Sequence, residues 1–400
     1  METRAEQPEI PARSLQVAQG GGAPDRIPAV QSGQGLQPKA RPALSLISGT
    51  RLAIAQSAEA APADWRDGLM QLAAWLELDI SEAPQRPVGA LRQVAAWAMP
   101  GVASTTAPVF APWQSVSTVA FQAGGHAGLP RAQWVASYLH DLGTGKPLKA
   151  STLDVMLMSA HPAVCSIDED CGAPLARTDL MQAMLRAAHA EGRRRVAIIV
   201  DASRRNAMVR QMLATGRNHP RDEQEIEILP IEDALCHLVR HAGRWDAIIV
   251  LPDLRSLVFA MLAEVTGIWT PWPMLWHARG LSLITGEVLD DADRALPLNA
   301  PLLVQALALA AQHAGLDHAA QRLMLGAAQI WDCGMITPGR GSVAPYITEV
   351  TDGEFIHQLC RGGRRPARRK AGWRAIPSTL NHHKPRPSRP MLRVVATGEE

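Results

Sequence analysis

Short aliphatic runs that alternate with amphipathic segments constrain the fold of this chain more than any other feature. Residues 196–200 (VAIIV) form an uninterrupted run of the kind that is buried on both faces of a sheet. Residues 44–47, 153–158 and 247–251 are further apolar runs that predict strands. Repeated strand–helix–strand units of this kind predict an α/β protein with a mostly parallel sheet covered by helices.

The amphipathic segments between these runs predict the helices. Residues 178–192 form the first, which begins at a threonine and ends at a glycine. Its apolar face consists of Met181, Met184, Leu185 and Ala188. A second helix precedes the strand at 247–251 and presents on one side Leu235, Leu238 and Val239. Two more helices are expected at about residues 300–314 and 317–331.

The composition indicates a soluble globular protein. The chain of 400 residues is 47% hydrophobic and 20% charged, and it is long enough for two domains. No stretch approaches the roughly 20 apolar residues that a membrane span needs, and the first residues lack the apolar core of a secretory signal. The five cysteines show no zinc-ligand spacing, so we expect reduced, mostly buried thiols and a cytoplasmic location.

Charge is distributed unevenly along the chain. Residues 361–400 contain 11 Lys or Arg and 2 Glu, which gives +9, so residues 1–360 carry 29 − 36 = −7. Residues 1–41 are rich in Gly, Gln and Pro, and we expect both this segment and 361–400 to be disordered. The basic tail is suited to nucleic acid or another anionic surface, and the alternative is a tail that solubilises the protein or docks on its acidic body.

Three motifs suggest ligand sites that other interpretations explain as well. Residues 140–147 resemble a phosphate-binding loop, but His140 and Pro147 stand where that motif needs Gly and Ser or Thr, so we interpret them as a turn. Residues 124–128 are glycine-rich like a dinucleotide fingerprint, but no clear strand precedes them. A third motif consists of Trp269, Trp272 and Trp276. These side chains would form either an aromatic ligand pocket or a plug in the core or in a subunit interface.

Segments along most of the chain resemble the isocitrate/isopropylmalate dehydrogenase family. Residues 245–254 (WDAIIVLPDL) are similar to the family's strand and turn FDVIVTENLFGDILSDLAA, and residues 276–280 stand where the family has its VHGSAPD cofactor loop. Further similar segments are 153–158 (DLVIVRENTEG in the family), 192–196 (RGRKKVT), 299–320 (ANP to EAADRI) and 337–355 (TPDLGG to SEFTDAI). The resemblance covers about residues 42–360 and is clear from residue 150 onward.

The resemblance implies a doubly wound, isopropylmalate-dehydrogenase-like fold. Residues 42–130 and 263–360 would form a larger, discontinuous α/β domain, and residues 131–262 a smaller central domain through which two subunits pair. The family reaction is the NAD- or NADP-linked oxidation of a 2-hydroxy acid followed by decarboxylation. It requires Mg²⁺ or a similar cation held by carboxylates, a Lys–Tyr proton relay, and arginines that bind the substrate carboxylates.

Most catalytic groups of the family are replaced in this sequence. The positions of two metal-binding aspartates hold Leu257 and Met261, whereas Glu232 aligns with a third and keeps a carboxylate. Asp253 lies nearby and is a candidate second metal ligand, or a cap for the helix that follows. The relay lysine aligns with Ala202 or with Arg204, and arginine does not release a proton near neutral pH.

The cofactor residues of the family are better matched than its catalytic ones. His277 aligns with the histidine of the cofactor loop and Asn299 with the adenine-side asparagine, so both are candidate ligands for NAD or NADP. His277 is equally explained as a partly buried structural histidine. Residues 159–166 lack the relay tyrosine, and Arg131 is the candidate for a substrate-binding arginine.

These replacements predict a divergent member that lacks the standard metal-dependent reaction. We expect a non-catalytic or nucleotide-binding, regulatory homodimer, which binds a small acid or a dinucleotide. The pairing surface would be an apolar helix face formed by Leu257, Phe259, Ala260 and Met261. The alternative is an active NAD(P)-dependent dehydrogenase that uses altered residues, for which the candidates are His161, Arg204, Glu232 and Asp253.

Overall fold

A computed structural model describes residues 51–54, 61–82, 108–124, 129, 131–141, 153–168, 172–215, 224–269, 271–278, 281–290, 295–338 and 347–362. These residues belong to a single compact unit, Leu46–Glu400. The predicted strand at 44–47 and the terminal segments 1–41 and 363–400 lie outside the described residues. The same holds for residues 125–128 and 142–147, which contain most of the two glycine-containing motifs.

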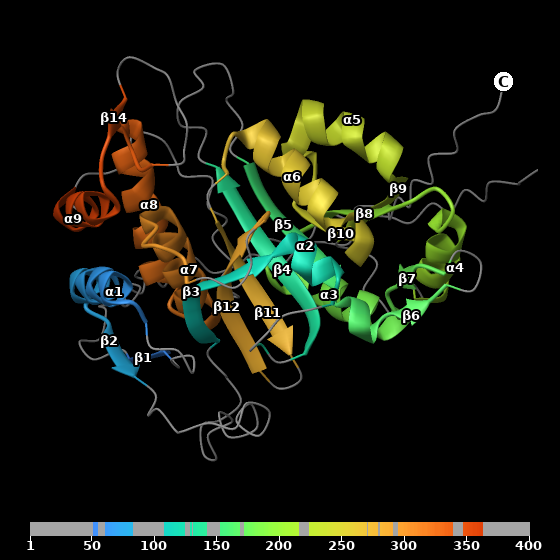
Figure 1. Cartoon of the computed structure of the whole chain (residues 1–400), viewed down its shortest axis with the longest axis horizontal. Helices are drawn as coiled ribbons and strands as arrows, with labels where there is room; N and C mark the ends of the chain where they lie inside the picture. The colour runs from blue at the N-terminus through green and yellow to red at the C-terminus, as the bar shows by residue number, and fades with distance from the viewer. Residues whose placement is uncertain are drawn as a thin grey trace, which may run out of the picture. The chain divides into compact units, whose positions relative to one another are not determined.

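An eight-stranded sheet forms the centre of this unit (Figure 1). In spatial order its strands are β3 (Val109–Ser117), β12 (Leu281–Val288), β11 (Trp272–Ala278), β4 (Ala132–Asp141), β5 (Leu153–Ala160), β10 (Ala247–Val250), β8 (Arg195–Val200) and β9 (Glu225–Pro230). Four of its seven pairings are parallel, and the three antiparallel ones all involve β4 or β11. The prediction of an α/β fold with a mostly parallel sheet and flanking helices is confirmed.

Helices cover both faces of the sheet because its central strands are apolar on both sides. In β8, Val196, Ile198 and Val200 face one hydrophobic cluster, and Ala197 and Ile199 face another. The first face is covered by α3 (Thr178–Ala190), α4 (Arg205–Thr215) and α7 (Ala300–His313). The second is covered by α5 (Ile231–His241), α6 (Arg255–Thr266) and the short α2 (Thr118–Gln122).

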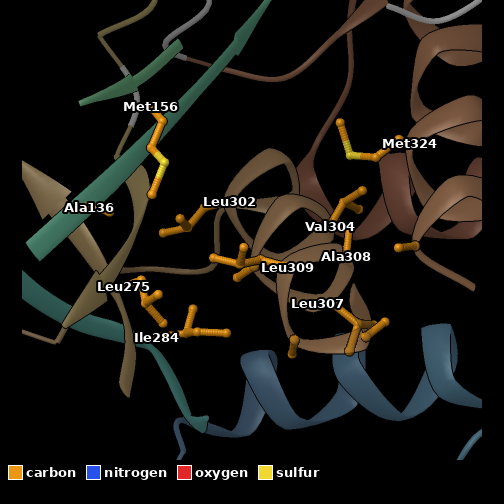
Figure 2. Close-up of a cluster of buried hydrophobic side chains, with 14 of the residues drawn as sticks. Ala136, Met156, Leu275, Ile284, Leu302, Val304, Leu307, Ala308, Leu309 and Met324 are labelled. Atoms are coloured by element: carbon orange, nitrogen blue, oxygen red, sulfur yellow. The ribbon is translucent and has the colours of Figure 1, made fainter. Parts of the chain in front are cut away.

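Helix α7 is the centre of the larger hydrophobic core. Figure 2 shows Leu302 and Leu309 of α7 on the side of the sheet residues Leu275 and Ile284, while Val304 lies on the side of α8. Behind α7 lie α1 (Ala63–Leu76), α8 (Asp317–Asp332) and α9 (Asp352–Gly362). Small residues allow these helices to approach closely: a Cβ atom added at Gly326 would lie 2.5 Å from a methyl group of Leu359.

Short elements complete the described chain. Three two-stranded sheets pair β1 (Arg51–Ile54) with β2 (Asp79–Glu82), β6 (Ser166–Ile167) with β7 (Pro174–Leu175), and β13 (Met335–Ile336) with β14 (Thr348–Glu349). Single 3-10 turns are η1 (Pro162–Val164), η2 (Ala242–Arg244) and η3 (Pro252–Leu254). Among the described helices, none is both long and apolar enough to cross a membrane.

Two of the predicted helix details are confirmed and two are wrong. All four residues expected on the apolar face of α3 are buried, and Gly192 follows that helix with a positive φ of 71°. The residue that caps α3 is Arg177, however, and not Thr178. In α5, Leu238 is buried but Val239 is 50% exposed, because the two side chains point about 100° apart on a helix.

The predicted burial of the tryptophans and thiols holds for only some of these side chains. Trp272 and Trp276 are buried in two different clusters, Trp272 against Phe259 with ring centroids 4.1 Å apart, whereas Trp269 is 52% exposed. Phe259 therefore belongs to the core beneath α6 and not to an outer pairing face. The expectation of buried thiols is wrong for Cys236 and Cys333, which are exposed.

A fully buried ion pair separates the two clusters on the second face of the sheet. Arg255 of α6 donates from Nε to Glu287 Oε1 at 2.9 Å and from Nη2 to Glu287 Oε2 at 2.8 Å, and both side chains are 0% exposed. Arg255 also donates to Ser137 Oγ and to the carbonyl of Leu157, and Ser137 donates to Glu287. Every one of these partners comes from a different strand or helix, so the pair ties α6 to β12, β4 and β5.

The same contacts cross the predicted boundary between the two domains. Strand β4 belongs to the predicted central domain and β11 to the larger one, yet they pair from Met274 opposite Ser137 to His277 opposite Trp134. The sheet is therefore continuous across that boundary, and the division into two domains stays a prediction.

Candidate functional site

The predicted site residues that follow strands gather at one edge of the sheet. Strands β11, β5, β10, β8 and β9 run in the same direction, so their carboxyl ends lie at the same edge. His161 directly follows β5, Asp253 lies three residues after β10, Arg204 four after β8 and Glu232 two after β9, while His277 is the penultimate residue of β11. Open α/β sheets bind ligands at this carboxyl edge, which makes it the candidate site.

Arg204 and Asp253 form an ion pair at the centre of this edge. The guanidinium donates from Nη2 to Asp253 Oδ2 at 2.5 Å and from Nη1 to Asp253 Oδ1 at 3.2 Å. Nη1 also donates to the carbonyl of Pro174 at 2.8 Å, and Nε donates to Asp201. The side chain of Arg204 is 3% exposed and that of Asp253 39%, so the pair presents its carboxylate side to solvent.

Asp201 holds Arg204 in place from its other side. Asp201 follows β8, and its Oδ1 accepts a hydrogen bond from the backbone N–H of Arg204 at 2.9 Å and another from the hydroxyl of Ser203. Burial alone would raise the pKa of Asp201, but these bonds and the Arg204 charge lower it below its usual value. Burial likewise opposes the charge of Arg204, yet the bonds and charge of Asp253 and Asp201 raise its pKa, so the guanidinium stays protonated.

The turn after β5 carries His161 and Cys165 beside this pair. His161 is 4% exposed, and its Nδ1 accepts a hydrogen bond from the backbone N–H of Ala163 at 3.2 Å. Burial, with a smaller effect of the Arg131 charge, lowers the pKa of His161 to about 4, so the imidazole is neutral at neutral pH. Burial and the charge of Asp253 raise the pKa of the Cys165 thiol to about 12, which leaves it without a nucleophilic thiolate.

Basic groups surround this turn. Arg131 is exposed and donates to the carbonyl of Ala163, and Arg177 is exposed and pairs with Asp179 at 2.5 Å. The charges of Arg177 and Arg204 both act on the Cys165 thiol, and that of Arg131 acts on His161. The edge therefore combines the half-exposed carboxylate of Asp253 and the exposed one of Glu232 with two exposed arginines.

The predicted metal ligands do not form a cluster with a third donor. Glu232 is exposed in the first turn of α5, and Asp253 gives both of its oxygens to Arg204. Among the residues that the structure describes, no group of three or more His, Cys, Asp or Glu side chains is arranged to hold a metal ion. At the positions of the two replaced aspartates, Leu257 is 43% exposed and Met261 half-buried.

The two predicted cofactor residues lie at opposite ends of α7. His277 stacks on Trp134 with ring centroids 4.7 Å apart, and its Nδ1 lies 3.1 Å from Ser282 Oγ. Burial lowers the pKa of His277. Burial also lowers the pKa of His313, the last residue of α7, and the charge of His277 lowers it further. Asn299 caps the other end, where its Oδ1 accepts from the N–H of Leu302 at 2.8 Å.

Helix α7 has 14 residues, so its two ends are about 20 Å apart at 1.5 Å per residue. Only His277 therefore lies at the carboxyl edge.

The positions of the lysines and tyrosines in the sequence also bear on whether a proton relay can form at this edge. All five lysines of the chain lie outside the described residues, at positions 39, 146, 149, 370 and 384. Of the two tyrosines, Tyr346 also lies outside them, and Tyr138 donates to Glu191 Oε1 at 2.6 Å. Tyr138 is opposite Met156 in the middle of β5, and its partner Glu191 stands before the start of β8, away from the candidate site. No lysine or tyrosine of the described chain is thus available for a proton relay there.

Comparisons with known proteins support the fold. A structure from Thermus thermophilus, the TT0538 protein, matches 81% of this chain and 70% of its own length with a TM-score of 0.52 and 11% identity. The isocitrate dehydrogenase of Methylococcus capsulatus matches 79% of this chain and 100% of its own, with a TM-score of 0.50 and 12% identity. No protein family matches the sequence, and no curated protein does. The chain therefore has an isocitrate-dehydrogenase-like fold, which is what the sequence resemblance implies.

Proposed function

We propose that the chain is a non-catalytic homodimer on an isocitrate-dehydrogenase-like fold that does not perform metal-dependent oxidative decarboxylation. The observation that carries the proposal is the Arg204–Asp253 ion pair. Arg204 is, with Ala202, one of the two residues that align with the family's relay lysine, and four of its five N–H donors are already directed at protein oxygens. Asp253, the candidate metal ligand, has both oxygens engaged by the same guanidinium.

The chemistry of the reaction explains why this arrangement does not support it. A divalent cation would have to be held by several carboxylate oxygens, while the residues at the aligned positions are Leu257, Met261, Glu232 and Asp253. Recruiting Asp253 would leave the 3%-exposed guanidinium of Arg204 without half of its ionic partners, and a buried unpaired charge is strongly disfavoured. The residues present therefore fit an internal ion pair better than a Mg²⁺ site.

Turnover assays test this proposal directly. Purified full-length protein should produce no NADH or NADPH from isocitrate, isopropylmalate, malate or tartrate, with or without millimolar Mg²⁺ or Mn²⁺. Neither metal should raise its melting temperature, because no cluster of described residues is arranged to bind one. An active isocitrate dehydrogenase assayed in parallel is the positive control. Metal-dependent production of NADH or NADPH that disappears in Asp253→Asn would overturn the proposal and favour the alternative of an altered dehydrogenase.

The same preparation distinguishes a nucleotide-binding role. His277 is stacked and hydrogen-bonded within the sheet, and Asn299 is the cap of α7 about 20 Å away, so we expect no saturable heat on titration with NAD or NADP. Saturable binding of either dinucleotide without turnover would favour a regulatory, nucleotide-binding protein. Arginines bind carboxylates, and Arg131 and Arg177 are exposed at this edge, so a small multivalent acid is the better candidate ligand there.

The proposal of a homodimer rests on the outer surface of the helices that cover the second face of the sheet. Helix α6 buries Val258, Phe259, Leu262 and Ala263 against the sheet and leaves Leu257 43% exposed. Its neighbour α5 adds an exposed valine, Val239 at 50%. We call this set, with Met261, the outer apolar surface. Exposed apolar side chains on adjacent elements are typical of subunit contacts.

Replacing Met261 with aspartate tests whether this surface pairs two subunits. Wild-type protein at micromolar concentration should give a dimer mass in light scattering, and Met261→Asp should shift the equilibrium toward monomer by about tenfold or more, because an unpaired carboxylate would be buried. Gln321→Asp, on the exposed side of α8, is the matched control and should remain dimeric. A monomeric wild type, or a Met261→Asp dimer as tight as the control, would show that the outer apolar surface is not the interface.

A further inference from the structure

The short helix α2 follows β3 and lies on the second face of the sheet, with its last two residues reaching the turns of the candidate edge. It begins at Ser117, whose Oγ accepts a hydrogen bond from the backbone N–H of Ala120 at 3.2 Å. The hydroxyls of Ser117 and Thr118 both donate to the carbonyl of Leu289 at 3.3 Å. On its other side α2 is followed by Gly124, which has a positive φ of 73°. These contacts hold the start of the helix to the sheet.

Phe121 is the one large side chain by which α2 enters the core. Its ring is 0% exposed and meets His161 edge-on at a centroid distance of 5.3 Å and Trp276 at 6.2 Å. The guanidinium carbon of Arg255 lies 5.5 Å from the ring centroid, which is the geometry of a cation–π contact. Val119, on the opposite side of α2, is 49% exposed, so the helix has an anchored face and a free face.

Gln122 connects α2 to the ion pair of the candidate site. Its side-chain amide donates to the backbone carbonyl of Asp253 at 2.7 Å, and this contact is exposed to solvent. Phe121 and Gln122 together therefore cover the His161 turn and the turn that presents Asp253. Both turns follow strands whose carboxyl ends form the candidate edge.

A helix of five residues is not stable without such anchors. Its first four N–H groups and last four carbonyls have no partner within the helix, and isolated helices shorter than about 12–15 residues are marginal in water. The stability of α2 therefore depends on Phe121, on Gln122 and on the Leu289 carbonyl. Segments held by so few contacts open with a lower free energy than the strands around them.

We propose that α2 is a detachable cover of the carboxyl edge and that Phe121 is its anchor. When Phe121 leaves its place, His161, Trp276 and the guanidinium face of Arg255 become accessible from that side. A ligand that enters would then meet an aromatic and cationic surface. The cover goes beyond the proposed function and is independent of it, since a covered edge is compatible with binding as well as with catalysis.

Hydrogen exchange of the wild-type protein is the first test. The amides that are hydrogen-bonded in α2, those of Ala120, Ala123 and Gly124, should exchange at least about tenfold faster than the amides of β4 and β11, which corresponds to a local opening that is easier by about 1.4 kcal/mol. Peptides from β4 and β11 in the same sample are the internal reference. Exchange of α2 only at the rate of global unfolding would overturn the proposal.

Substitution of the anchor is the second test, with His161 as the probe. In Phe121→Ala the pKa of His161, followed by NMR titration, should rise from about 4 by at least one unit, because the ordinary pKa of histidine is about 6.5. Val119→Ala, on the exposed side of the same helix, should leave it unchanged. A folded Phe121→Ala protein with an unshifted His161 and unchanged exchange of α2 would show that Phe121 is a core residue and no anchor of a cover. If that variant does not fold, the wild-type exchange decides.

Discussion

Glu287→Gln is expected to lower the free energy of unfolding by about 3–5 kcal/mol, because it leaves the fully buried guanidinium of Arg255 without its counter-charge. Both side chains are 0% exposed. Glutamine keeps the shape of glutamate but accepts through one oxygen only, while Arg255 directs Nε at one carboxylate oxygen and Nη2 at the other. Its amide group would therefore face a donor. Urea unfolding followed by tryptophan fluorescence measures the loss.

Two further variants separate the buried charge from the loss of a contact. Glu264→Gln, at an exposed position of α6, should stay within about 0.5 kcal/mol of the wild type. The double variant Arg255→Met with Glu287→Met should recover most of the stability, since an apolar pair of similar volume removes both charges together. Glu287→Gln that unfolds like the wild type would mean that water or another group reaches Arg255 and that the pair is not dry.

Three of the parallel strands, β5, β8 and β10, could be predicted from the sequence, whereas β3, β9 and the antiparallel strands could not. Residues 196–200 and 247–251 are short, uninterrupted aliphatic runs bounded by polar residues, which is what a strand buried on both faces requires. Strands β11 and β12 contain tryptophan, proline, histidine, glycine and glutamate. Their apolar pattern is interrupted because β12 carries the buried Glu287, and a buried carboxylate in a strand is explained only by its distant partner Arg255.

The candidate site shows the same limit. The resemblance led to Arg204 and Asp253 separately, as a relay substitute and a metal ligand, because each was compared with its own motif. Their pairing joins residues 49 positions apart, and it follows from β8 and β10 being neighbours in the sheet. Asp201 was within reach of the sequence, since an aspartate three residues before Arg204 and directly after a strand is typical of a side chain that accepts from the next backbone N–H groups. The covering role of Phe121 depends on β3, β4 and β11 lying together and had no local signal.

At the amino edge of the sheet, Asp246→Asn should also lower the free energy of unfolding. Asp246 is 3% exposed. Its Oδ2 accepts from the backbone N–H groups of Arg194 at 3.1 Å and Arg195 at 3.0 Å, and its Oδ1 accepts from Arg195 Nη2 at 2.7 Å. Asparagine retains one acceptor oxygen and turns an NH₂ group toward donors on the other side. We expect a loss of about 2–3 kcal/mol in urea unfolding, since hydrogen bonds to a buried charge contribute more than neutral ones.

The loss should come from the backbone contacts more than from the ion pair. The side chain of Arg195 is 48% exposed, and pairs with such an exposed partner contribute about 0–1 kcal/mol. Arg195→Met alone should therefore cost about 1 kcal/mol or less, and Asp246→Asn should keep most of its effect in the Arg195→Met background. Asp233→Asn, at an exposed position in the first turn of α5, is the control for removing a carboxylate that is not buried. If Arg195→Met abolished the effect of Asp246→Asn, the salt bridge would dominate. The start of β8 would then be held to β10 by the charge of Arg195, and not by the hydrogen bonds that Asp246 accepts from the two backbone N–H groups.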